Sequence, residues 1–511
     1  MFVTRGVSPR FLLQVLPRSR VRRSFFAYCG LIATGAVFWD ANQSSKTFVL
    51  ADSRTKPMGA RADFVVEKDY DTFEKEYEFV EVIGKGGFAE IWKVKHKLTG
   101  LVRAAKIVTL DTHNDYRLFR NEVDVLKRLD SPYNVRIVNS YISTNRSGFR
   151  NPSGSRRGAI VYHFIKGDDL LDTINQRIAT KNKYTDEEIA LITKHILKAI
   201  CYVHHCGILH RDIKPENFIV ERDDSPERFN LRLIDFGLSH SLTSGSGTGD
   251  RASGTWFYSA PETISNSYSA KSDLWSAGII LTMLASPQGT ALIGRSTSMG
   301  IAGVKRIRDP VFISTEIDKL AKIGISHELV HLLKRMLDPS IESRITPLDA
   351  LNDPVLSPPT AEPSSVDRWR RSKSVFESLP LFARHVRRLY VHEMNDSDFP
   401  RLRFLFRIID KEARGTVTIA DDGTDYQFGY REFLAAGLED GDIQGRLESF
   451  FKFLSNGGDL ITDEILLEKF PGLDMNAIRH MIGSCRPGDS RDTSNSMSFD
   501  DFQRCMLTPL T

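Results

Sequence analysis

A glycine-rich turn is the first part of the chain whose residue types could do chemistry. The turn, Gly84–Ile91 (GKGGFAEI), lies between two stretches rich in β-branched and aromatic residues, which predict strands. Glycines let backbone N–H groups approach phosphate oxygens, because no Cβ atom stands in the way. The turn joins strand to strand rather than strand to helix, which argues against a dinucleotide-binding fingerprint.

A lysine in a later apolar strand is the second such feature. Lys106 lies in the run Arg103–Ile107 (RAAKI), where a charged group is costly unless it is paired. Glu122, on the predicted helix that follows, is a suitable partner. On its own such a pair is more typical of a surface salt bridge, so its meaning depends on the rest of the chain.

Three later motifs give these residues a context: His210–Asn217 (HRDIKPEN), Asp235–Gly237 (DFG) and Ala260–Glu262 (APE). Together with the glycine-rich turn, the strand lysine and the helix glutamate, they make the sequence resemble the eukaryotic protein kinases, whose motifs occur in this order. The resemblance covers roughly residues 77–356. The lysine two residues after the aspartate of the first motif is typical of the serine/threonine branch.

The resemblance implies how these residues share the work of phosphoryl transfer. That reaction needs charge neutralisation and in-line positioning more than covalent catalysis. Lys106, paired with Glu122, is expected to hold the α- and β-phosphates of ATP. Asp212 is expected to accept the hydrogen bond of a protein Ser/Thr hydroxyl, and Lys214 to stabilise the transferring phosphate. These four are the expected catalytic residues.

ATP and Mg²⁺ are the cofactors that the resemblance implies. Asn217 and Asp235 are the expected Mg²⁺ ligands. The residues expected to contact the nucleotide are Ile83, Gly84, Lys85, Gly86, Gly87, Phe88, Ala89, Ile91, Lys106, His163 and Asp169.

Two positions depart from the family pattern without removing its chemistry. Ala89 replaces the third glycine of the turn, which is a small change. Tyr162 falls at the gatekeeper position, so we expect the rear of the adenine pocket to be closed to bulky inhibitors. A pseudokinase would lack Lys106, Asp212 or Asp235, and the chain retains all three.

The resemblance also points to regulation and substrate choice. Arg211 is a position that often meets a phosphorylated activation loop, and the loop at 238–259 is rich in Ser, Thr and Gly. Asp169 and Glu216 fall at acidic positions that bind a substrate arginine, so a preference for Arg near position −3 is a hypothesis. Two further positions are expected to be structural, with Asp273 supporting the catalytic loop and Arg344 pairing with Glu262.

The elements that must position these residues form a small β-rich lobe followed by a larger helical lobe. Three antiparallel strands are predicted between 77 and 110, and apolar residues spaced three or four apart predict a helix over 113–129. Helical periods dominate after residue 165, as in 186–206, 273–286 and 326–337. The fold class is therefore α+β, a two-lobed kinase followed by an all-α domain that resembles EF-hands.

The amino terminus differs from the rest in charge. Residues 1–39 hold six Arg and no Lys, Asp or Glu, and end in a sixteen-residue apolar run, shorter than the about 20 residues that span a bilayer. A signal-anchor, an organellar transit segment, a secretory signal and a disordered leader remain alternatives. The localisation expected is organellar or membrane-associated rather than free cytosolic, with membrane contact through this segment. Residues 40–76 are expected to be a linker.

The region after the kinase resembles that of the calcium-dependent protein kinases of plants and protists. The expected order is a kinase domain at 77–356, a junction or autoinhibitory segment at 357–399 and a degenerate EF-hand domain at 400–508. In that family the junction blocks the kinase until calcium reorganises the EF-hands. The resemblance therefore implies regulation by the tail, with Ca²⁺ as a further cofactor.

The calcium ligands of the first two loops are poor. A calcium loop needs oxygen ligands at positions 1, 3 and 5, Gly at 6 and Glu at 12. A loop that begins at Asp410 has Arg414 at position 5, which puts a cation where an oxygen is needed. A loop that begins at Asp421 has Tyr426 in place of the glycine. Because the two loops share Asp421, we expect a fusion or deletion here.

The last two loops have better spacing. They begin at Leu454 and Ser490, 36 residues apart, as a pair of hands requires. Asp492 and Asp501 of the second are the candidate Ca²⁺ ligands, although Asn495 replaces its glycine. The sequence leaves open a calcium-regulated kinase, a calcium-independent kinase with a docking tail, and an inactive scaffold.

Composition limits the function classes further. The chain has 511 residues, too many for one compact domain, with 69 Lys and Arg against 65 Asp and Glu. Without the six N-terminal Arg, 63 basic residues face 65 acidic ones, so charge gives no case for nucleic-acid binding. Five scattered cysteines, at 29, 201, 206, 485 and 505, do not suggest a disulfide framework, and Cys201 and Cys206 are expected to pack in the core.

Overall fold

The alternating runs between residues 77 and 110 form three antiparallel strands, as predicted, within a six-stranded sheet. The structure is a computed structural model and describes residues 64–86, 89–143, 156–222, 229–241, 256–265, 267–289, 306–357, 362–421, 424–485 and 495–507. The predicted targeting segment at 1–39 and the candidate ligand Asp492 lie outside these ranges. Of the helices within them, none combines the length and the apolar character that crossing a membrane requires.

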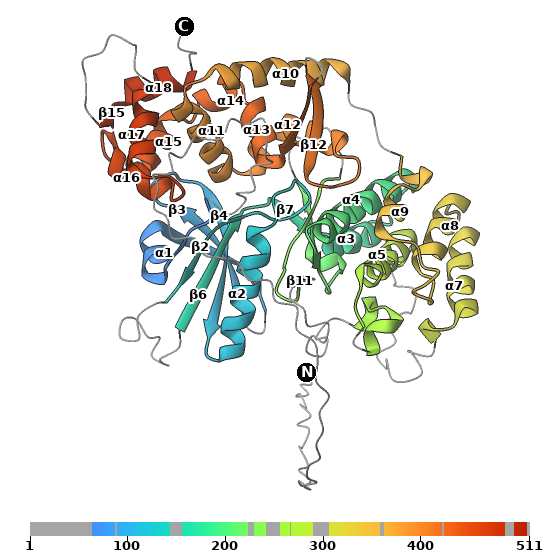
Figure 1. Ribbon diagram of the computed structural model, residues 1–511. Helices are drawn as coiled ribbons and strands as arrows, with labels where there is room; N and C mark the ends of the chain where they lie inside the picture. The colour runs from blue at the N-terminus through green and yellow to red at the C-terminus, as the bar shows by residue number, and fades with distance from the viewer. Residues whose placement is uncertain are drawn as a thin grey trace, which may run out of the picture. The chain divides into compact units, whose positions relative to one another are not determined.

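The sheet of the N-lobe has the strand order β1-β5-β6-β4-β3-β2, with helix α2 packed against it (Figure 1). The lobe's elements are β1 (Glu67–Asp69), α1 (Tyr70–Glu76), β2 (Tyr77–Lys85), β3 (Ala89–His96), β4 (Val102–Leu110), α2 (His113–Lys127), β5 (Ile137–Ile142) and β6 (Arg156–His163). Helix α2 begins with a capping box between Thr112 and Asp115, and its predicted apolar face buries Phe119, Val123 and Leu126.

The segment just before the predicted kinase boundary is not a linker. Residues 67–69 form β1, which pairs in parallel with β5, and α1 follows with Asp69 as its N-cap. Tyr70 and Phe73 of α1 are buried in a cluster on the sheet. The linker prediction for 40–76 is therefore wrong for residues 67–76, because aromatic side chains there cover the sheet edge.

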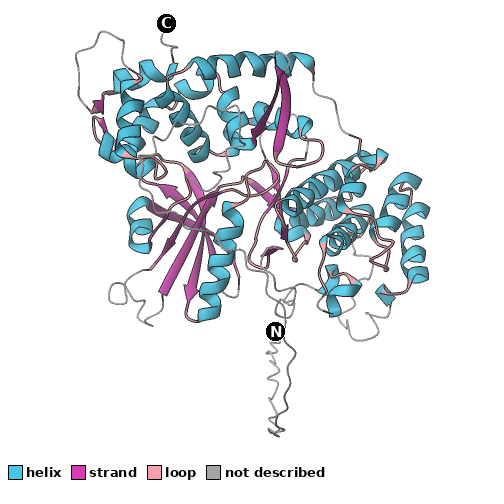
Figure 2. Ribbon diagram, in the orientation of Figure 1, coloured by secondary structure: helices cyan, strands magenta, loops and turns pink. Residues whose placement is uncertain are grey.

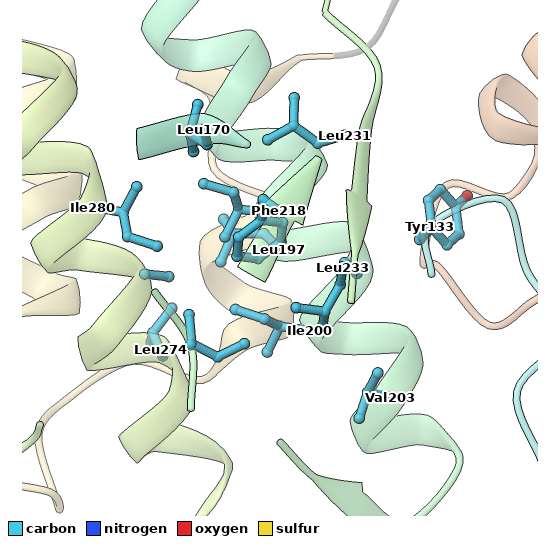
Figure 3. Close-up of a cluster of buried hydrophobic side chains, with 14 of the residues drawn as sticks. Tyr133, Leu170, Leu197, Ile200, Val203, Phe218, Leu231, Leu233, Leu274 and Ile280 are labelled. Atoms are coloured by element: carbon cyan, nitrogen blue, oxygen red, sulfur yellow. The ribbon is translucent and has the colours of Figure 1, made fainter. Parts of the chain in front are cut away.

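The C-lobe is mainly helical, and the short strands within it carry the catalytic loop (Figure 2). Figure 3 shows the core under that loop, where Phe218 and Leu233 of two paired strands gather with Leu197, Ile200 and Ile280 of the long helices α4 and α5. The lobe's elements are β7 (Gly167–Asp169), α3 (Leu170–Ala179), α4 (Asp186–His205), β8 (Ile208–Leu209), β9 (Phe218–Glu221), β10 (Leu231–Leu233), β11 (His240–Ser241), α5 (Ala270–Ala285), α7 (Pro310–Lys322), α8 (His327–Met336) and α9 (Pro347–Leu351).

The region after residue 362, which we call the tail, has a hydrophobic core of its own. Its elements are α10 (Pro363–Ser378), α11 (Leu381–Glu393), α12 (Pro400–Ile409), β12 (Thr416–Asp421), β13 (Thr424–Gly429), α13 (Tyr430–Gly437), α14 (Asp440–Gln444), α15 (Leu447–Leu454), β14 (Ile461–Thr462), α16 (Asp463–Lys469), α17 (Met475–Gly483), β15 (Ser496–Met497) and α18 (Phe499–Leu507). Trp369 of α10 stacks on Phe433 of α13, with ring centroids 4.7 Å apart. Helices α10 and α11, within the predicted junction at 357–399, contribute to the same core as the predicted domain at 400–508.

The last part of the tail contains two helix-loop-helix units joined by a short strand pair. Helix α15 ends at Leu454, and Ile461, seven positions later, pairs with Met497. Helix α18 begins at Phe499, two positions after Met497. Helices α16 and α17 fill the stretch between the two strands.

The first part of the tail repeats this spacing without the two inner helices. Val417, seven positions after Asp410 at the end of α12, pairs with Phe428, and α13 begins two positions later at Tyr430. A hairpin of β12 and β13 takes the place of the inner helices. The geometry agrees with the predicted fusion of two loops around Asp421.

One pair of cysteines departs from the sequence-based expectation. Cys485 and Cys505 form a disulfide that ties the end of α17 to α18, and both residues are buried. The two cysteines are 20 positions apart in the chain, and this spacing matches no motif that predicts a disulfide. Cys201 is buried in the C-lobe core, as expected, and burial raises the pKa of its thiol to about 12.

Candidate active site

Three charged residues predicted from separate motifs are joined by hydrogen bonds through one of them, Lys106. Lys106 Nζ on β4 donates to both carboxylate oxygens of Glu122 on α2, at 2.9 Å each. The same ammonium donates to Asp235 Oδ1 at 3.0 Å. Glu122 is buried and the side chain of Lys106 is 16% exposed, so this pair is not the surface salt bridge that a lone lysine suggested.

The electrostatics of this group favour the charged forms. Burial alone disfavours the ammonium of Lys106, but the carboxylates of Glu122 and Asp235 outweigh it and raise the lysine's pKa. Burial likewise disfavours the carboxylate of Asp235, but Lys106 outweighs it and holds that pKa below its usual value. Both groups are therefore ionised at neutral pH.

The catalytic loop brings Asp212, Lys214 and Asn217 within hydrogen-bonding distance of one another. Lys214 Nζ donates to Asp212 Oδ2 at 2.6 Å. The amide nitrogen of Asn217 donates to the backbone oxygen of Asp212 at 2.7 Å and to Oδ2 at 3.1 Å. These bonds fix the orientation of the Asn217 amide, so its oxygen is the atom left for a cation.

Buried ion pairs support this loop, as predicted. Asp273 on α5 accepts the backbone N–H groups of His210 and Arg211 at 3.0 and 2.9 Å. Burial alone would raise the pKa of Asp273, but His204, with a smaller contribution from the Arg211 N–H, holds it below its usual value. Arg344 donates to both carboxylate oxygens of Glu262, at 2.7 and 3.0 Å. Both predicted structural roles are confirmed.

The glycine-rich turn is closed by backbone bonding between its two strands. Gly86 N–H donates to the backbone oxygen of Ala89 at 2.9 Å, and Gly84 pairs with Ile91. Ile83 is 46% exposed at the end of β2. Lys85 pairs with Glu90, and Gly87 and Phe88 lie outside the described residues.

The side chain of His163, an expected nucleotide contact, is buried beside Arg136. His163 is 3% exposed, and its Nδ1 lies 3.4 Å from a nitrogen of Arg136. Its ring centroid is 6.5 Å from that of His392 in the tail. Burial and the neighbouring Arg136 hold its pKa well below the usual value. Only the backbone of His163 remains for contact with a nucleotide.

The two acidic positions expected near a substrate arginine differ in how they are used. Asp169 caps α3, with Oδ1 accepting the N–H of Asp172 at 2.8 Å. Glu216 has a buried Oε2 without a hydrogen-bond partner, and burial raises the pKa of its carboxyl.

A network of buried charges between the kinase and the tail was missed by sequence reasoning. Asp396 accepts from Arg232 of β10 at 2.5 Å and lies 3.1 Å from a nitrogen of Arg136. Glu221 of β9 accepts from Arg403 of α12 at 2.7 Å. All five side chains are at most 7% exposed. Although burial opposes it, Arg232 and Arg403 lower the pKa of Glu221 to about 2.

The tail also reaches the strand that carries the catalytic lysine. Arg103, three positions before Lys106 on β4, donates to Asn395 Oδ1 at 2.8 Å and to the backbone oxygen of Glu393. Arg103 is 1% exposed. The signal that sequence could have offered is the cost of a second buried cation in one apolar strand, which requires a partner elsewhere in the chain.

The first tail loop is seated on the kinase through Asp410. Its carboxylate accepts the N–H groups of Arg414 and Gly415, at 2.9 and 3.0 Å, and the hydroxyl of Tyr133 at 3.2 Å. Lys198 of α4 donates to the backbone oxygen of Asp410 at 2.9 Å. Gly415 has a φ of +71°, and a Cβ there would overlap the ring of Tyr202 on α4.

The remaining calcium candidates show different partners. Asp501 lies inside α18, where its carboxylate pairs with Ser498 at 2.8 Å and Arg504 at 3.1 Å. Asp463 at the start of α16, which was not a calcium candidate, accepts from Arg479 at 2.7 Å. Within the described ranges, no three His, Cys, Asp or Glu side chains group as a metal site.

Comparison with known proteins agrees with this site. The model of the protein kinase domain matches residues 77–356. The chain is 28% identical over 370 residues to calcium-dependent protein kinase 27 of Arabidopsis thaliana, covering 70% of each chain. It is 25% identical over 472 residues to calcium-dependent protein kinase 3 of Plasmodium berghei (strain Anka), covering 84% of this chain and 79% of that protein.

A shorter match is closer in sequence. The chain is 34% identical over 207 residues to mitogen-activated protein kinase kinase 1 of Arabidopsis thaliana, covering 40% of this chain and 53% of that protein. The family match covers more than half of the chain and includes every motif described above. The chain therefore belongs to the protein kinase family, and it is a protein serine/threonine kinase.

Proposed function

We propose that this kinase uses Lys106, Asp212, Lys214, Asn217 and Asp235 to transfer the γ-phosphate of ATP to a protein Ser or Thr hydroxyl. The observation that carries the proposal is the position of the Lys106 ammonium, which has carboxylate oxygens of both Glu122 and Asp235 within 3.0 Å. The ammonium of Lys106 would bind phosphate oxygens when Asp235 is a ligand of a metal ion.

The donor set fits Mg²⁺. Asp235 offers a carboxylate with a lowered pKa. Asn217 offers its amide oxygen, because its amide nitrogen donates to Asp212. Oxygen ligands of this kind suit a hard cation. Mg²⁺, when bound, neutralises charge on the phosphates and orients them.

The chain's own groups do the rest. Asp212 accepts the hydrogen bond of the incoming hydroxyl and so holds its oxygen in line with the γ-phosphate. Lys214, 2.6 Å from Asp212 Oδ2, lies where charge on the transferred group can be balanced. Asp273 keeps the backbone of this loop in place through its bonds to His210 and Arg211.

The Mg²⁺ dependence of the rate tests these roles. Phosphorylation of a basic peptide by the full chain is followed at increasing Mg²⁺, for the wild type and for Asn217→Ala. The variant is expected to need more Mg²⁺ for half its maximal rate. Asn456→Ala, in a tail loop, is the matched control and should behave as the wild type. An unchanged Mg²⁺ requirement in Asn217→Ala would contradict the assignment.

We also propose that the tail is an EF-hand-like region that stays docked on the kinase without calcium in its first loop. The specific observation is Asp410, the residue at which a calcium loop would begin. Its carboxylate and backbone oxygen are already engaged by two backbone N–H groups, Tyr133 and Lys198. The ammonium of Lys198 is a fixed cation that the kinase itself supplies.

The two alternatives for the tail give different results with Asp410→Asn. If Asp410 holds the tail on the kinase, the variant of the full chain melts at a lower temperature, by the same amount in Ca²⁺ and in chelator. If Asp410 is a calcium ligand, only the wild type is stabilised by Ca²⁺, and the variant loses that increment. The first result is expected, and the second would overturn the proposal.

A further inference from the structure

A tyrosine at the rear of the nucleotide cleft shares the glutamate that pairs with the catalytic lysine. Tyr162 Oη donates to Glu122 Oε1 at 2.9 Å. The same oxygen accepts from Lys106 Nζ at 2.9 Å. We propose that Tyr162 is a positioning residue, which holds Glu122 of α2 inward through its hydroxyl and so keeps Lys106 ready for the phosphates of ATP.

The strand pairing explains why the hydroxyl reaches the glutamate. On β4 and β6, Lys106 stands opposite Ile160, and Ala104 stands opposite Tyr162. Residues directly opposite in a sheet share a face, and residues two apart on one strand do so as well. Tyr162 and Lys106 therefore point to the same side of the sheet, where Glu122 of α2 lies between them.

Burial makes the bond to Glu122 hard to replace. Tyr162 is 9% exposed and Glu122 is 5% exposed, so neither group has ready access to water. A buried tyrosine hydroxyl needs a partner, and a carboxylate is a strong one. Burial and the adjacent Glu122 raise the pKa of Tyr162 well above its usual value, so the hydroxyl remains a donor.

The bond gains importance when nucleotide binds. In this structure Lys106 is shared between Glu122 and Asp235. With ATP and Mg²⁺ bound, Lys106 would share its hydrogen bonds with phosphate oxygens and Asp235 would be a ligand of the ion, so Glu122 would keep fewer of its bonds to Lys106. Tyr162 lies on β6, and the hydrogen bond from its hydroxyl to Glu122 does not depend on nucleotide. This bond therefore keeps Glu122 in place when nucleotide binds.

The substitution Tyr162→Phe removes the hydroxyl and retains the ring. We expect kcat for a peptide substrate to fall by about tenfold or more, because a hydrogen bond to a charged group is lost from the catalytic arrangement. The KM for ATP should change much less, since the shape of the pocket is kept. Tyr390→Phe is the matched control, because it removes a buried hydroxyl that bonds to Asp442 in the tail, and it should leave kcat unchanged.

A double-mutant comparison separates positioning from a general effect on folding. In the background of Glu122→Gln, whose amide no longer holds Lys106 as an ion pair, Tyr162→Phe should cost much less than it does in the wild type. Hydrogen exchange gives a second readout, with faster exchange expected in α2 and unchanged exchange in α5. Equal kcat in Tyr162→Phe and wild type, or the same loss in both backgrounds with no change in α2, would overturn the proposal.

Discussion

The kinase cleft and the loops of the tail both contain carboxylates, but the protein uses them in opposite ways. In the cleft, Asp235 contacts Lys106, and both of these groups have capacity for a metal ion or a phosphate. In the tail, Asp410 is enclosed by backbone N–H groups and by the kinase, and Asp501 accepts from Arg504. A carboxylate at a ligand position is thus a ligand only where the protein has not already supplied its cation.

Buried arginines form ion pairs with carboxylates in both regions. In the active-site region, Arg344 and Glu262 form a pair that holds the fold below the cleft. In the contact between kinase and tail, Arg232 and Arg136 converge on Asp396. The tail's charges stabilise one docked arrangement, since a buried charge without its partner is costly.

The largest difference between the two regions is expected when a carboxylate of the kinase active site is removed. Asp212→Asn should lower the phosphorylation rate of a peptide by about a thousandfold, because a positioned acceptor for the substrate proton typically contributes 10²–10⁴. ADP release measures the rate. Asp459→Asn, in a tail loop, is the control and should retain wild-type activity. A loss of similar size in both variants would remove the distinction between the two regions.

Removing a carboxylate from the buried contact tests stability instead. Asp396→Asn leaves Arg136 without its counter-charge and Arg232 with Glu221 as its remaining carboxylate, and it should lower the free energy of unfolding by about 3 kcal/mol. Denaturant unfolding of the full chain measures it. Asp398→Asn is the control, because its partner Arg446 is 42% exposed, and its cost should be below about 1 kcal/mol. Equal costs would show that the network does not hold the tail.

Acid should destabilise the folded protein through its buried neutral histidines. Burial lowers the pKa of His163, His195 and His392 well below 6.5, so each stays neutral in the folded protein. The unfolded chain binds protons at about pH 6.5, so stability is fully present above that pH and falls as the pH drops below it. Each histidine contributes about 1.4 kcal/mol per pH unit. Melting temperatures between pH 7.5 and 5.5 should show this decline, and His392→Gln should make it shallower. A flat profile would contradict buried neutral histidines.

The smallest expected effect concerns the substrate. Glu216 has an unpartnered buried oxygen, whereas Asp169 caps a helix. Glu216→Gln should lower kcat/KM roughly fivefold for a peptide with Arg near position −3, as expected for one partly solvated ion pair. A peptide with Ala at that position is the control and should be used equally well by both proteins. Equal preference for Arg in the variant would remove the hypothesis.

The kinase part of the fold follows from the sequence because its residues act through local motifs. The strands at 77–110, the helix that carries Glu122 and the catalytic loop are each defined by a short pattern and a required partner. The family order of those patterns then fixes which distant residues meet. The side-chain direction of His163 could not be predicted, because it depends on Arg136 and on a tail helix more than 200 residues later.

The tail follows from the sequence only in part. A fusion or deletion around Asp421 was predicted, because two loops cannot share one residue and both remain complete. The contacts of Asp410 with the kinase were not predicted, because its partners Tyr133 and Lys198 lie more than 200 residues away in the chain. The disulfide between Cys485 and Cys505 was missed for the same reason, since packing and not spacing brings the two residues together.

The central claim is that the tail is docked on the kinase without calcium. The most direct measurement is the phosphorylation rate of a basic peptide by the full chain, in saturating Ca²⁺ and in chelator, at fixed Mg²⁺. Equal rates in the two conditions are expected, because Lys198 and buried arginines already hold the tail. A severalfold higher rate in Ca²⁺ would contradict the account and make the tail a calcium switch.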